Sequence, residues 1–306
     1  TGAVAVHSDD PVDPVGAALA AALRSGAVEY GRTRFRRVDV ADPADGPALV
    51  SALHVDAPEL AVRRDGLYAK TLEPSGDEDH DSWAPESLAH VLITGGTGRL
   101  GLEFADWFAA RGAGRITVVS RSGGDADARA RLAGIARRHR VPVDVLRVDL
   151  TDPADVATLT EILAAPVTLL VHAALDYVAA PLGECDRATV ERALAAKVSG
   201  LHRVLEALEP SAGDGGDVRA LSGVLLCSSL AGTLGGREQG LYAAGNALLD
   251  AEAAALRRRG IPATAIAWGL WRAVGPLSAE EVDRVTATGV IPMAPDAALA
   301  AGARIR

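Results

Sequence analysis

Two side chains suited to proton transfer stand near each other in the last third of the sequence. Ser229 follows the apolar run Val224–Cys227, Tyr242 comes thirteen residues later, and Asn246 follows four residues beyond it. Residues four apart share one face of a helix, so Tyr242 and Asn246 are predicted to face the same space. This set suits carbonyl reduction: Ser229 hydrogen-bonds the oxygen and Tyr242 gives it a proton while a cofactor delivers hydride. Taken alone, Tyr242 is better explained as an ordinary tyrosine packed in a buried helix, so the rest of the chain must decide.

A glycine-rich loop lies between a predicted strand and a predicted helix. His90–Thr94 is an apolar run typical of a buried strand, and a helical pattern follows through Phe104. Between them, Gly96-x-Gly98-x-x-Gly101 fits the dinucleotide-binding fingerprint. The glycines permit a tight turn and let a pyrophosphate approach the helix N-terminus. The sequence therefore predicts a dinucleotide cofactor.

The residues after the next predicted strand, Arg115–Val119, favour NADPH over NADH. An NAD-binding domain places an acid there for the ribose 2′-hydroxyl, whereas this chain has Ser120 and Arg121, which suit a 2′-phosphate. The alternative is that Arg121 is a solvated surface charge. Asp149, near the end of the predicted strand Val143–Leu150, is expected beside the adenine, although it could also cap the next helix.

Two further polar residues are expected to be structural unless other evidence places them in a site. His172 opens the run His172-Ala173-Ala174 after the predicted strand Val167–Val171. The small residues of this run would let the chain pass close to the nicotinamide half of a cofactor, while His172 is expected to be packed and hydrogen-bonded. Lys197 lies in the predicted helix Thr189–Leu208, and a single lysine on a helix is usually solvated.

Alternating strands and helices over residues 90–270 predict a doubly wound parallel sheet. The last of its strands is expected at Ala263–Gly269, and the loop Trp271–Pro276 has the position and composition of a substrate lid. Residues 1–75 alternate more weakly and carry no nucleotide motif, which predicts a scaffold. Its expected elements are strands at Ala3–Val6 and Phe35–Val40, helices at Val15–Leu23 and Pro47–Leu53, and a hairpin around Asp65-Gly66. An acidic linker with Pro and Gly, residues 73–85, separates the two regions.

Composition excludes several other classes of protein. The 306 residues are 49% hydrophobic with a positive mean hydropathy, which indicates a globular protein. A net charge of −9 gives no general basic footprint for nucleic acid. Two cysteines, Cys185 and Cys227, predict neither a disulfide framework nor a metal site and fit a reducing cytoplasm. No run suits a membrane span or signal peptide, and the start at Thr1 suggests a segment of a longer protein.

Taken together, the motifs resemble the ketoreductase domain of modular type I polyketide synthases, a branch of the short-chain dehydrogenase/reductases. The resemblance covers roughly residues 88–297. The motifs that carry it are Thr94–Gly101, His172-Ala173-Ala174, Lys197-Val198, Ser228-Ser229, Ala231-Gly232, Gln239–Asn246 and Ala267-Trp268-Gly269. It implies an α/β fold in which residues 86–306 form a Rossmann-type, doubly wound catalytic subdomain. Residues 1–85 would be a linker and part of a truncated, degenerate Rossmann-like structural subdomain.

The resemblance also implies roles for individual residues. Tyr242 would be the proton donor and Ser229 would orient the ketone. Lys197 would lower the pKa of Tyr242 and join the proton relay, with Asn246 in support. Most short-chain dehydrogenases have the lysine four residues after the tyrosine, where this chain has Asn246, and an upstream lysine is characteristic of the polyketide and fatty-acid synthase type. NADPH would be bound by Thr94, Gly95, Gly96, Thr97, Gly98, Arg99, Leu100, Gly101, Ser120, Arg121, Asp149, Leu150, Ala173 and Ala174. No metal is implied.

The implied reaction is NADPH-dependent reduction of the β-keto group of a polyketide intermediate on an acyl carrier protein, giving a β-hydroxyacyl thioester. The implied partners are that carrier protein and the other domains of the same synthase, in the cytoplasm, without nucleic acid or membrane. Two alternatives stay open: a redox-inactive or epimerising domain with a structural role, and a free-standing reductase of small ketones or sugars. NADPH binding without turnover would favour the former, whereas the N-terminal scaffold disfavours the latter.

The chain departs from the family pattern at several positions. Leu175 stands where the family has a glycine, Gly245 where it has an alanine, and Ser122 where it has a second arginine. The Leu-Asp-Asp marker of one stereochemical class would fall on Tyr177–Ala179, and the marker tryptophan of the opposite class is Leu234. The sequence therefore assigns no configuration to the product alcohol.

Overall fold

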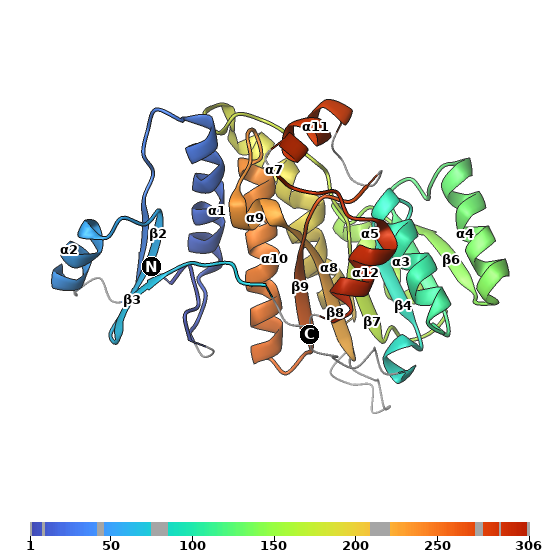
Figure 1. Ribbon diagram of the computed structural model, residues 1–306. Coiled ribbons are helices and arrows are strands. Elements are labelled where there is room, and N and C mark those ends of the chain that lie inside the picture. Colours follow the sequence, from blue (N-terminus) through green and yellow to red (C-terminus); the bar gives the residue numbers. More distant parts are fainter. Residues whose placement is uncertain are drawn as a thin grey trace.

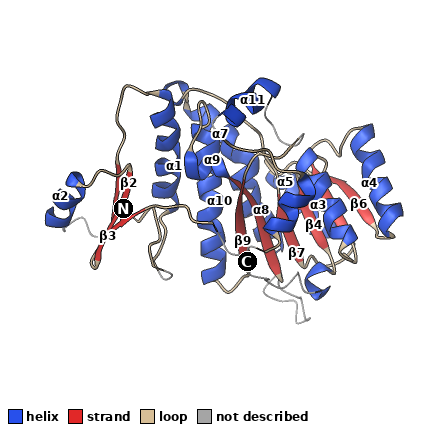
Figure 2. Cartoon of the chain, in the orientation of Figure 1, coloured by secondary structure: helices blue, strands red, loops and turns tan. Residues whose placement is uncertain are grey.

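A six-stranded parallel sheet forms the larger part of the molecule (Figure 1 and Figure 2). The computed structural model describes residues 2–7, 10–41, 46–74, 85–208, 221–272, 278–287 and 289–304. The strands of this sheet are β4 (Val91–Thr94), β5 (Ile116–Ser120), β6 (Val143–Arg147), β7 (Leu169–His172), β8 (Gly223–Ser229) and β9 (Ala263–Trp268). Their order is β6-β5-β4-β7-β8-β9, so the winding direction reverses between β4 and β7, where doubly wound sheets bind their ligands. The predicted fold class is confirmed.

Helices cover both faces of this sheet, which explains why its central strands are apolar throughout. Every residue of β4 and of β7 is buried, a pattern typical of parallel sheets with two covered faces. One face packs against α3 (Arg99–Ala110), α4 (Ala126–His139) and α12 (Pro295–Gly302). The other face packs against α5 (Pro153–Ala157), α6 (Leu159–Ile162), α8 (Gly200–Leu208) and α10 (Gly240–Arg258).

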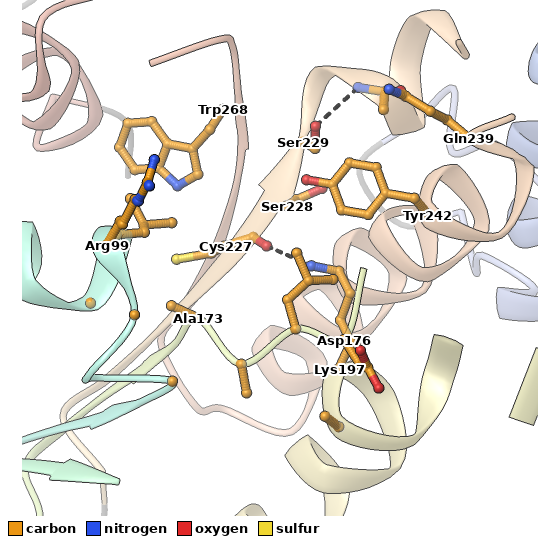
Figure 3. A pocket seen from close by; sticks show the side chains of 18 of the residues that line it. Arg99, Ala173, Asp176, Lys197, Cys227, Ser228, Ser229, Gln239, Tyr242 and Trp268 are labelled. Carbon is orange, nitrogen blue, oxygen red and sulfur yellow. Dashed lines mark hydrogen bonds between the residues drawn. The ribbon is translucent and has the colours of Figure 1, made fainter. Parts of the chain in front are cut away.

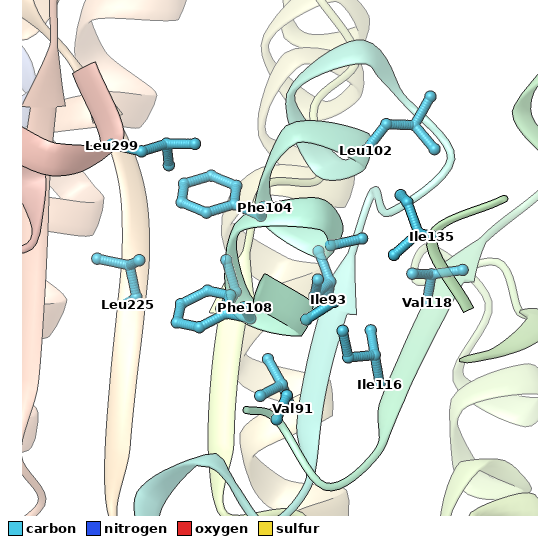
Figure 4. Packing of buried hydrophobic residues seen from close by; sticks show 14 of the residues in the cluster. Val91, Ile93, Leu102, Phe104, Phe108, Ile116, Val118, Ile135, Leu225 and Leu299 are labelled. Carbon is cyan, nitrogen blue, oxygen red and sulfur yellow. The ribbon is translucent and has the colours of Figure 1, made fainter. Parts of the chain in front are cut away.

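The apolar core between α3 and the sheet fixes the position of the glycine-rich loop (Figure 4). Phe104 and Phe108 are each 1% exposed, and their stacked ring centroids lie 6.2 Å apart. Phe104 also meets the Trp268 ring edge-on, at 6.1 Å. Truncating a buried phenylalanine to alanine typically costs about 3–5 kcal/mol. This packing holds the first turn of α3 against the end of β4.

The N-terminal residues form a smaller mixed sheet with two helices. The elements are α1 (Pro14–Glu29), β1 (Arg37–Val40), α2 (Gly46–His54), β2 (Glu59–Arg63) and β3 (Gly66–Ala69). β1 runs parallel to β2, and β2 and β3 form the predicted antiparallel hairpin, in which Arg63 pairs with Gly66. The strand predicted at Ala3–Val6 is wrong, because the backbone N–H of Ala3 donates to the Asp39 carboxylate at 2.8 Å instead of pairing with a strand.

Helix α1 joins this smaller region to the large sheet. It lies along α10 (Figure 1), where Ala21, Ala243 and Ala247 meet in a small apolar cluster. Alanines at such a contact let two helices approach closely. Arg24 of α1 is also buried and forms an ion pair of 2.7 Å with Glu59 of β2. The helix therefore contacts both parts of the molecule.

The remaining elements are short helices and helical turns. They are η1 (Pro85–Leu88), η2 (Leu182–Glu184), α7 (Arg187–Leu194), the π-helical turn η3 (Ala195–Ser199), α9 (Leu230–Leu234) and α11 (Ala279–Ala287). The single helix predicted over Thr189–Leu208 is thus α7, η3 and α8 in succession, with a π turn in its middle. The predicted linker at 73–85 and the loop Trp271–Pro276 fall largely outside the described residues.

Candidate active site

A cavity of about 1240 Å³ opens at the C-terminal edge of the large sheet. Three predicted catalytic residues line it, Lys197, Ser229 and Tyr242. The predicted cofactor residues that line it are Gly95, Thr97, Gly98, Arg99, Leu100, Gly101, Ser120, Arg121, Asp149, Leu150, Ala173 and Ala174. Thr94, Gly96 and Asn246 lie in the protein behind this lining. The structure thus brings residues from far apart in the sequence to one hollow.

Ser229 lies where β8 ends and α9 begins. Its backbone is extended, with φ −147° and ψ 148°, and its Oγ accepts a hydrogen bond of 3.2 Å from the Ala231 N–H (Figure 3). Accepting this bond uses a lone pair of the oxygen and leaves the hydroxyl proton able to donate into the cavity. The hydroxyl is therefore held in place as a hydrogen-bond donor.

Tyr242 lies in the first turn of α10, with its ring in the cavity beside Ser229 (Figure 3). Burial raises the pKa of its phenol, and hydrogen bonding by Ser229 and Asn246 offsets part of that rise. The phenol is consequently neutral at pH 7 and carries a transferable proton. The ring of Tyr177 packs edge-on against that of Tyr242, with centroids 5.3 Å apart, and restricts its orientation.

Lys197 is buried, unlike a typical lysine on a helix. Lys197 is 4% exposed, and its Nζ donates to the Cys227 carbonyl oxygen at 3.0 Å (Figure 3). The same nitrogen lies 5.7 Å from the centroid of the Tyr242 ring. Burial lowers the pKa of Lys197 to about 8, because a charged amine loses its hydration there. At neutral pH the site therefore holds a cation beside the phenol.

His172 and Thr94 fix the backbone of the π turn that carries Lys197. The His172 Nε2 lies 2.8 Å from the Lys197 carbonyl oxygen, and its Nδ1 lies 2.8 Å from the Thr94 Oγ1. Complete burial lowers the pKa of His172 to about 3, so the ring is neutral. A carbonyl can only accept, so Nε2 carries the proton and Nδ1 accepts from the threonine hydroxyl. His172 is thus hydrogen-bonded and structural, and π turns are common at functional sites.

Asn246 lies one turn after Tyr242, on the side of α10 that faces β8. Its Nδ2 donates to the Tyr242 carbonyl oxygen at 2.7 Å, and its own carbonyl oxygen accepts from the Ser228 hydroxyl at 3.3 Å. Within the described part of the chain, its Oδ1 is buried without a hydrogen-bond partner. Asn246 therefore ties the first turns of α10 to the strand that carries Ser229.

The glycine-rich loop faces these residues from the other half of the cavity. Gly95 has φ +67°, which favours glycine, and an added Cβ would lie 2.7 Å from the Ala173 carbonyl oxygen. At Gly98, by contrast, an added Cβ would meet a single atom within 4 Å, the Gly95 oxygen at 3.1 Å, so the rest of its surroundings is open. Gly96 packs away from the cavity against Val118.

The start of α3 is suited to an anion. Gly98 is its N-cap and provides no side-chain hydrogen bond, so backbone N–H groups of the first turn face the cavity near Arg99 and Leu100. Together with the positive end of the helix dipole, these groups suit a pyrophosphate. The open space at Gly98 and these N–H groups fit the phosphates of a dinucleotide.

The ends of β5 and β6 add a cation and a carboxylate to the cavity. Arg121 is 70% exposed, and its Nη1 lies 3.9 Å from the Asp176 Oδ2, an exposed pair of little energetic value that leaves the guanidinium able to turn to a phosphate. Asp149 accepts from the Thr151 N–H at 2.9 Å and hydroxyl at 2.8 Å, and these bonds lower its pKa. Ser120 accepts from the Gly123 N–H at 3.1 Å.

Val28 of α1 also lines the cavity, and no signal in the sequence pointed to it. Cys227 and the segment Leu234–Gln239 are further parts of the wall. Burial raises the pKa of Cys227 to about 12, so its thiol is not a nucleophile at neutral pH. Among the described residues, no group of three or more His, Cys, Asp or Glu side chains is placed to hold a metal ion. No described helix has the length and apolar character needed to cross a membrane.

Comparison with known proteins finds similar chains. The sequence model of a family described as the KR domain matches residues 89–273. The chain is 36% identical, over 97% of its length, to the pikromycin polyketide synthase component PikAIII of Streptomyces venezuelae. It spans 19% of that protein and 4% of the polyketide synthase GfsA of Streptomyces halstedii, so it corresponds to a small part of its curated relatives.

Solved structures of similar chains have the same fold. The ketoreductase from the first module of phoslactomycin biosynthesis in Streptomyces sp. HK803 is 33% identical, with a TM-score of 0.86 over 99% of this chain and 71% of that one. The first ketoreductase of the tylosin polyketide synthase is 31% identical, with a TM-score of 0.85 over 99% of this chain and 65% of that one.

Proposed function

Because the chain belongs to the KR-domain family, the ketoreductases of modular polyketide synthases, we propose that it reduces the β-keto group of an acyl thioester with NADPH. The thioester would be carried on an acyl carrier protein of the same synthase, and the product would be a β-hydroxyacyl thioester. The observation that carries the proposal is the convergence of Lys197, Ser229 and Tyr242 on one cavity, opposite an intact glycine-rich loop.

Tyr242 and Ser229 would act together on the ketone oxygen. Ser229 donates a hydrogen bond to that oxygen, and the neutral phenol of Tyr242 gives it a proton. The chemistry that NADPH supplies when bound along the glycine-rich loop is hydride donation to the carbonyl carbon. The oxygen gains the Tyr242 proton as the carbon gains the hydride, so the ketone becomes a neutral alcohol.

Lys197 would stabilise the tyrosinate that remains. Its ammonium, held by the Cys227 carbonyl oxygen, is the cation near the phenol ring, and it is protonated below about pH 8. Low dielectric inside the cavity strengthens the attraction between the two charges. The tyrosinate then regains a proton, through Lys197, before the next turnover.

Arg121 supports NADPH as the cofactor rather than NADH. It lines the cavity beside Asp149, at the end that lies away from Tyr242, and it is a suitable partner for a 2′-phosphate. The start of α3 and Gly98 would hold the pyrophosphate, while Ala173 and Ala174 leave room for the nicotinamide.

The first test is NADPH oxidation with a diketide N-acetylcysteamine thioester, measured by absorbance for the protein and its Tyr242→Phe variant. Phenylalanine keeps the ring contact with Tyr177 and removes the transferable proton. We expect kcat to fall about 10³-fold, within the range for loss of a general acid, with NADPH affinity and melting temperature unchanged.

Two results would contradict the proposal. Full activity of the Tyr242→Phe variant would show that Tyr242 is not the proton donor. NADPH binding without any turnover by the unaltered protein would favour a redox-inactive or epimerising domain, an alternative that the complete set of Lys197, Ser229 and Tyr242 does not favour.

A further inference from the structure

The C-terminal end of α1 holds two backbone positions, one in the segment Leu234–Gln239 that lines the cavity and one in η2. One oxygen of Glu29, Oε1, accepts from the Glu238 N–H at 2.9 Å, and the other, Oε2, accepts from the Leu182 N–H at 2.8 Å. These two backbone groups are far apart in the sequence and belong to different segments. A single carboxylate from the N-terminal region therefore connects them.

The same end of α1 contacts α9 and the α9–α10 loop at three more points. The Ser25 Oγ accepts from the Gly236 N–H at 3.2 Å, and the Arg24 Nη1 donates to the Gly232 carbonyl oxygen at 2.7 Å. At Gly235 an added Cβ would lie 2.6 Å from the Arg24 carbonyl carbon, so the two backbones touch. This loop is the connection between Ser229 and Tyr242, and it is packed directly on α1.

Glu238 has a backbone conformation that needs such support. Its φ is +60°, in the left-handed region that a residue other than glycine rarely occupies. Strained residues of this kind persist only when their surroundings fix them. Here the N–H of Glu238 is held by Glu29, and its carbonyl oxygen accepts from the Ala180 N–H at 3.0 Å.

The positions that α1 holds are also walls of the cavity. Val28, which precedes Glu29, lines it together with Leu234, Gly235, Gly236, Arg237, Glu238 and Gln239. Gln239 lies near Tyr242 in Figure 3. Among the described residues, the glycine-rich loop on the cofactor side forms no hydrogen bond with α1. Any effect of α1 on the cavity should therefore fall on the tyrosine side.

We propose that Glu29 is a positioning residue that sets the shape of the substrate-side wall and thereby the affinity of the site for the β-ketoacyl thioester. The proposal rests on the proposed function, since that function names the substrate. Glu29 does not line the cavity; it acts through the backbone of Glu238 and Leu182. Without it the α9–α10 loop loses a fixed end and the wall beside Tyr242 loosens.

The test is the Glu29→Gln variant, which keeps the length of the side chain but leaves one acceptor oxygen for two N–H groups. We expect the KM for a diketide thioester to rise about fivefold to tenfold, as for a weakened charge-assisted hydrogen bond. The kcat and the KM for NADPH should stay within about twofold of the unaltered protein, because Tyr242 and the glycine-rich loop keep their own contacts.

The matched control lies at the other end of the same helix. Asp13 is the N-cap of α1 and also accepts from two backbone N–H groups, of Val15 at 3.2 Å and Gly16 at 2.9 Å, but it does not line the cavity. Asp13→Ala should lower the melting temperature and leave the KM for the thioester unchanged. An equal rise in KM for both variants would overturn the proposal, since the effect would then follow stability alone.

A second substitution links the effect to Glu238. Asparagine tolerates the left-handed region better than glutamate, so Glu238→Asn should reduce the dependence of the loop on Glu29. The rise in KM caused by Glu29→Gln should therefore shrink in the double variant. A rise of the same size with and without Glu238→Asn, or no rise at all, would overturn the positioning role.

Hydrogen exchange gives a readout that does not depend on turnover. Glu29→Gln should speed amide exchange at Leu182 and over Gly236–Gln239, with exchange in α3 and α4 unchanged. If the unaltered protein proves inactive, the proposed function fails while this measurement still decides the role of Glu29. Unchanged exchange in the loop would overturn the inference even if the protein is an active ketoreductase.

Discussion

The two sides of the cavity are built in different ways. The cofactor side comes from short stretches that each follow a strand: Gly95–Gly101 after β4, Ser120-Arg121 after β5 and Ala173-Ala174 after β7. The tyrosine side includes Val28 of α1 and the segment between α9 and α10, which Glu29 connects to η2. One side follows from the edge of a parallel sheet, whereas the other depends on contacts between distant segments.

Because they are built differently, the two sides of the cavity tolerate different substitutions. Steric limits bind the cofactor side: at Gly95, Gly96 and Gly101 an added Cβ would meet another atom at 2.7 Å or less. Apart from Gly235, which packs on the backbone of Arg24, the tyrosine side is held by hydrogen bonds to backbone groups, such as those of Glu29. Such bonds tolerate changes in the side chains that face the cavity. We therefore expect substitutions on the cofactor side to act on NADPH and those on the tyrosine side to act on the ketone.

After loss of the proton donor Tyr242, the largest effect is expected at Lys197, where the two sides meet. Lys197→Met should lower kcat about 10²- to 10³-fold, because the tyrosinate loses its cation. Stability should not fall. Since folding lowers the pKa of Lys197 to about 8, its charge destabilises the folded protein below that pH, and the destabilisation fades as pH rises toward 10.5. Thermal unfolding at pH 7 should show a melting temperature equal to or above that of the unaltered protein, and a large drop would contradict this reading.

The dependence of kcat on pH distinguishes the titration of Lys197 from that of Tyr242. The protonated form of Lys197 is the active one, so kcat should fall as pH rises through about 8. Burial raises the pKa of Tyr242, which places its titration at a higher pH. The residual kcat of the Lys197→Met variant should no longer fall near pH 8. If the fall near pH 8 remains, it belongs to another titrating group.

A strong effect confined to the cofactor side is expected at Gly98. Its φ of −73° and ψ of 164° are allowed for valine, so Gly98→Val should fold. The added side chain would occupy the open space where a pyrophosphate approaches α3, and we expect the KM for NADPH to rise about 100-fold. Gly134→Ala is the matched control, because an added Cβ there meets nothing within 4 Å. If fluorescence titration shows unchanged NADPH affinity in Gly98→Val, the pyrophosphate does not bind at the start of α3.

The sequence predicted the cofactor side better than the tyrosine side, because the two sides are built in different ways. The glycine-rich loop, Ser229 and Tyr242 could be placed because each follows a recognisable strand or begins a helix, and the edge of a parallel sheet brings such ends together. The burial of Lys197 and the π turn around it could not, because both depend on His172 and Cys227 from other strands. Glu29 and Val28 gave no signal at all, since nothing local distinguishes them from other residues on the surface of a helix.

A smaller effect is expected at Arg121. Arg121→Ala should raise the KM for NADPH about tenfold, the value of one charge-assisted hydrogen bond, and leave the KM for NADH within about twofold. The exposed pair with Asp176 contributes little, so stability should be unaffected. Equal losses with both cofactors, measured side by side, would show that Arg121 does not face a 2′-phosphate.

The most direct test of the central claim is to follow the transferred hydrogen. The protein would be given a diketide N-acetylcysteamine thioester and NADPH carrying deuterium at the transferred position of the nicotinamide, and the product would be examined by mass spectrometry and NMR. Hydride transfer from NADPH to the ketone predicts one deuterium on the carbon that bears the new hydroxyl group, and loss of that product in the Tyr242→Phe variant. Exchange at the carbon between the two carbonyl groups, with the ketone intact and no deuterium transferred, would contradict it.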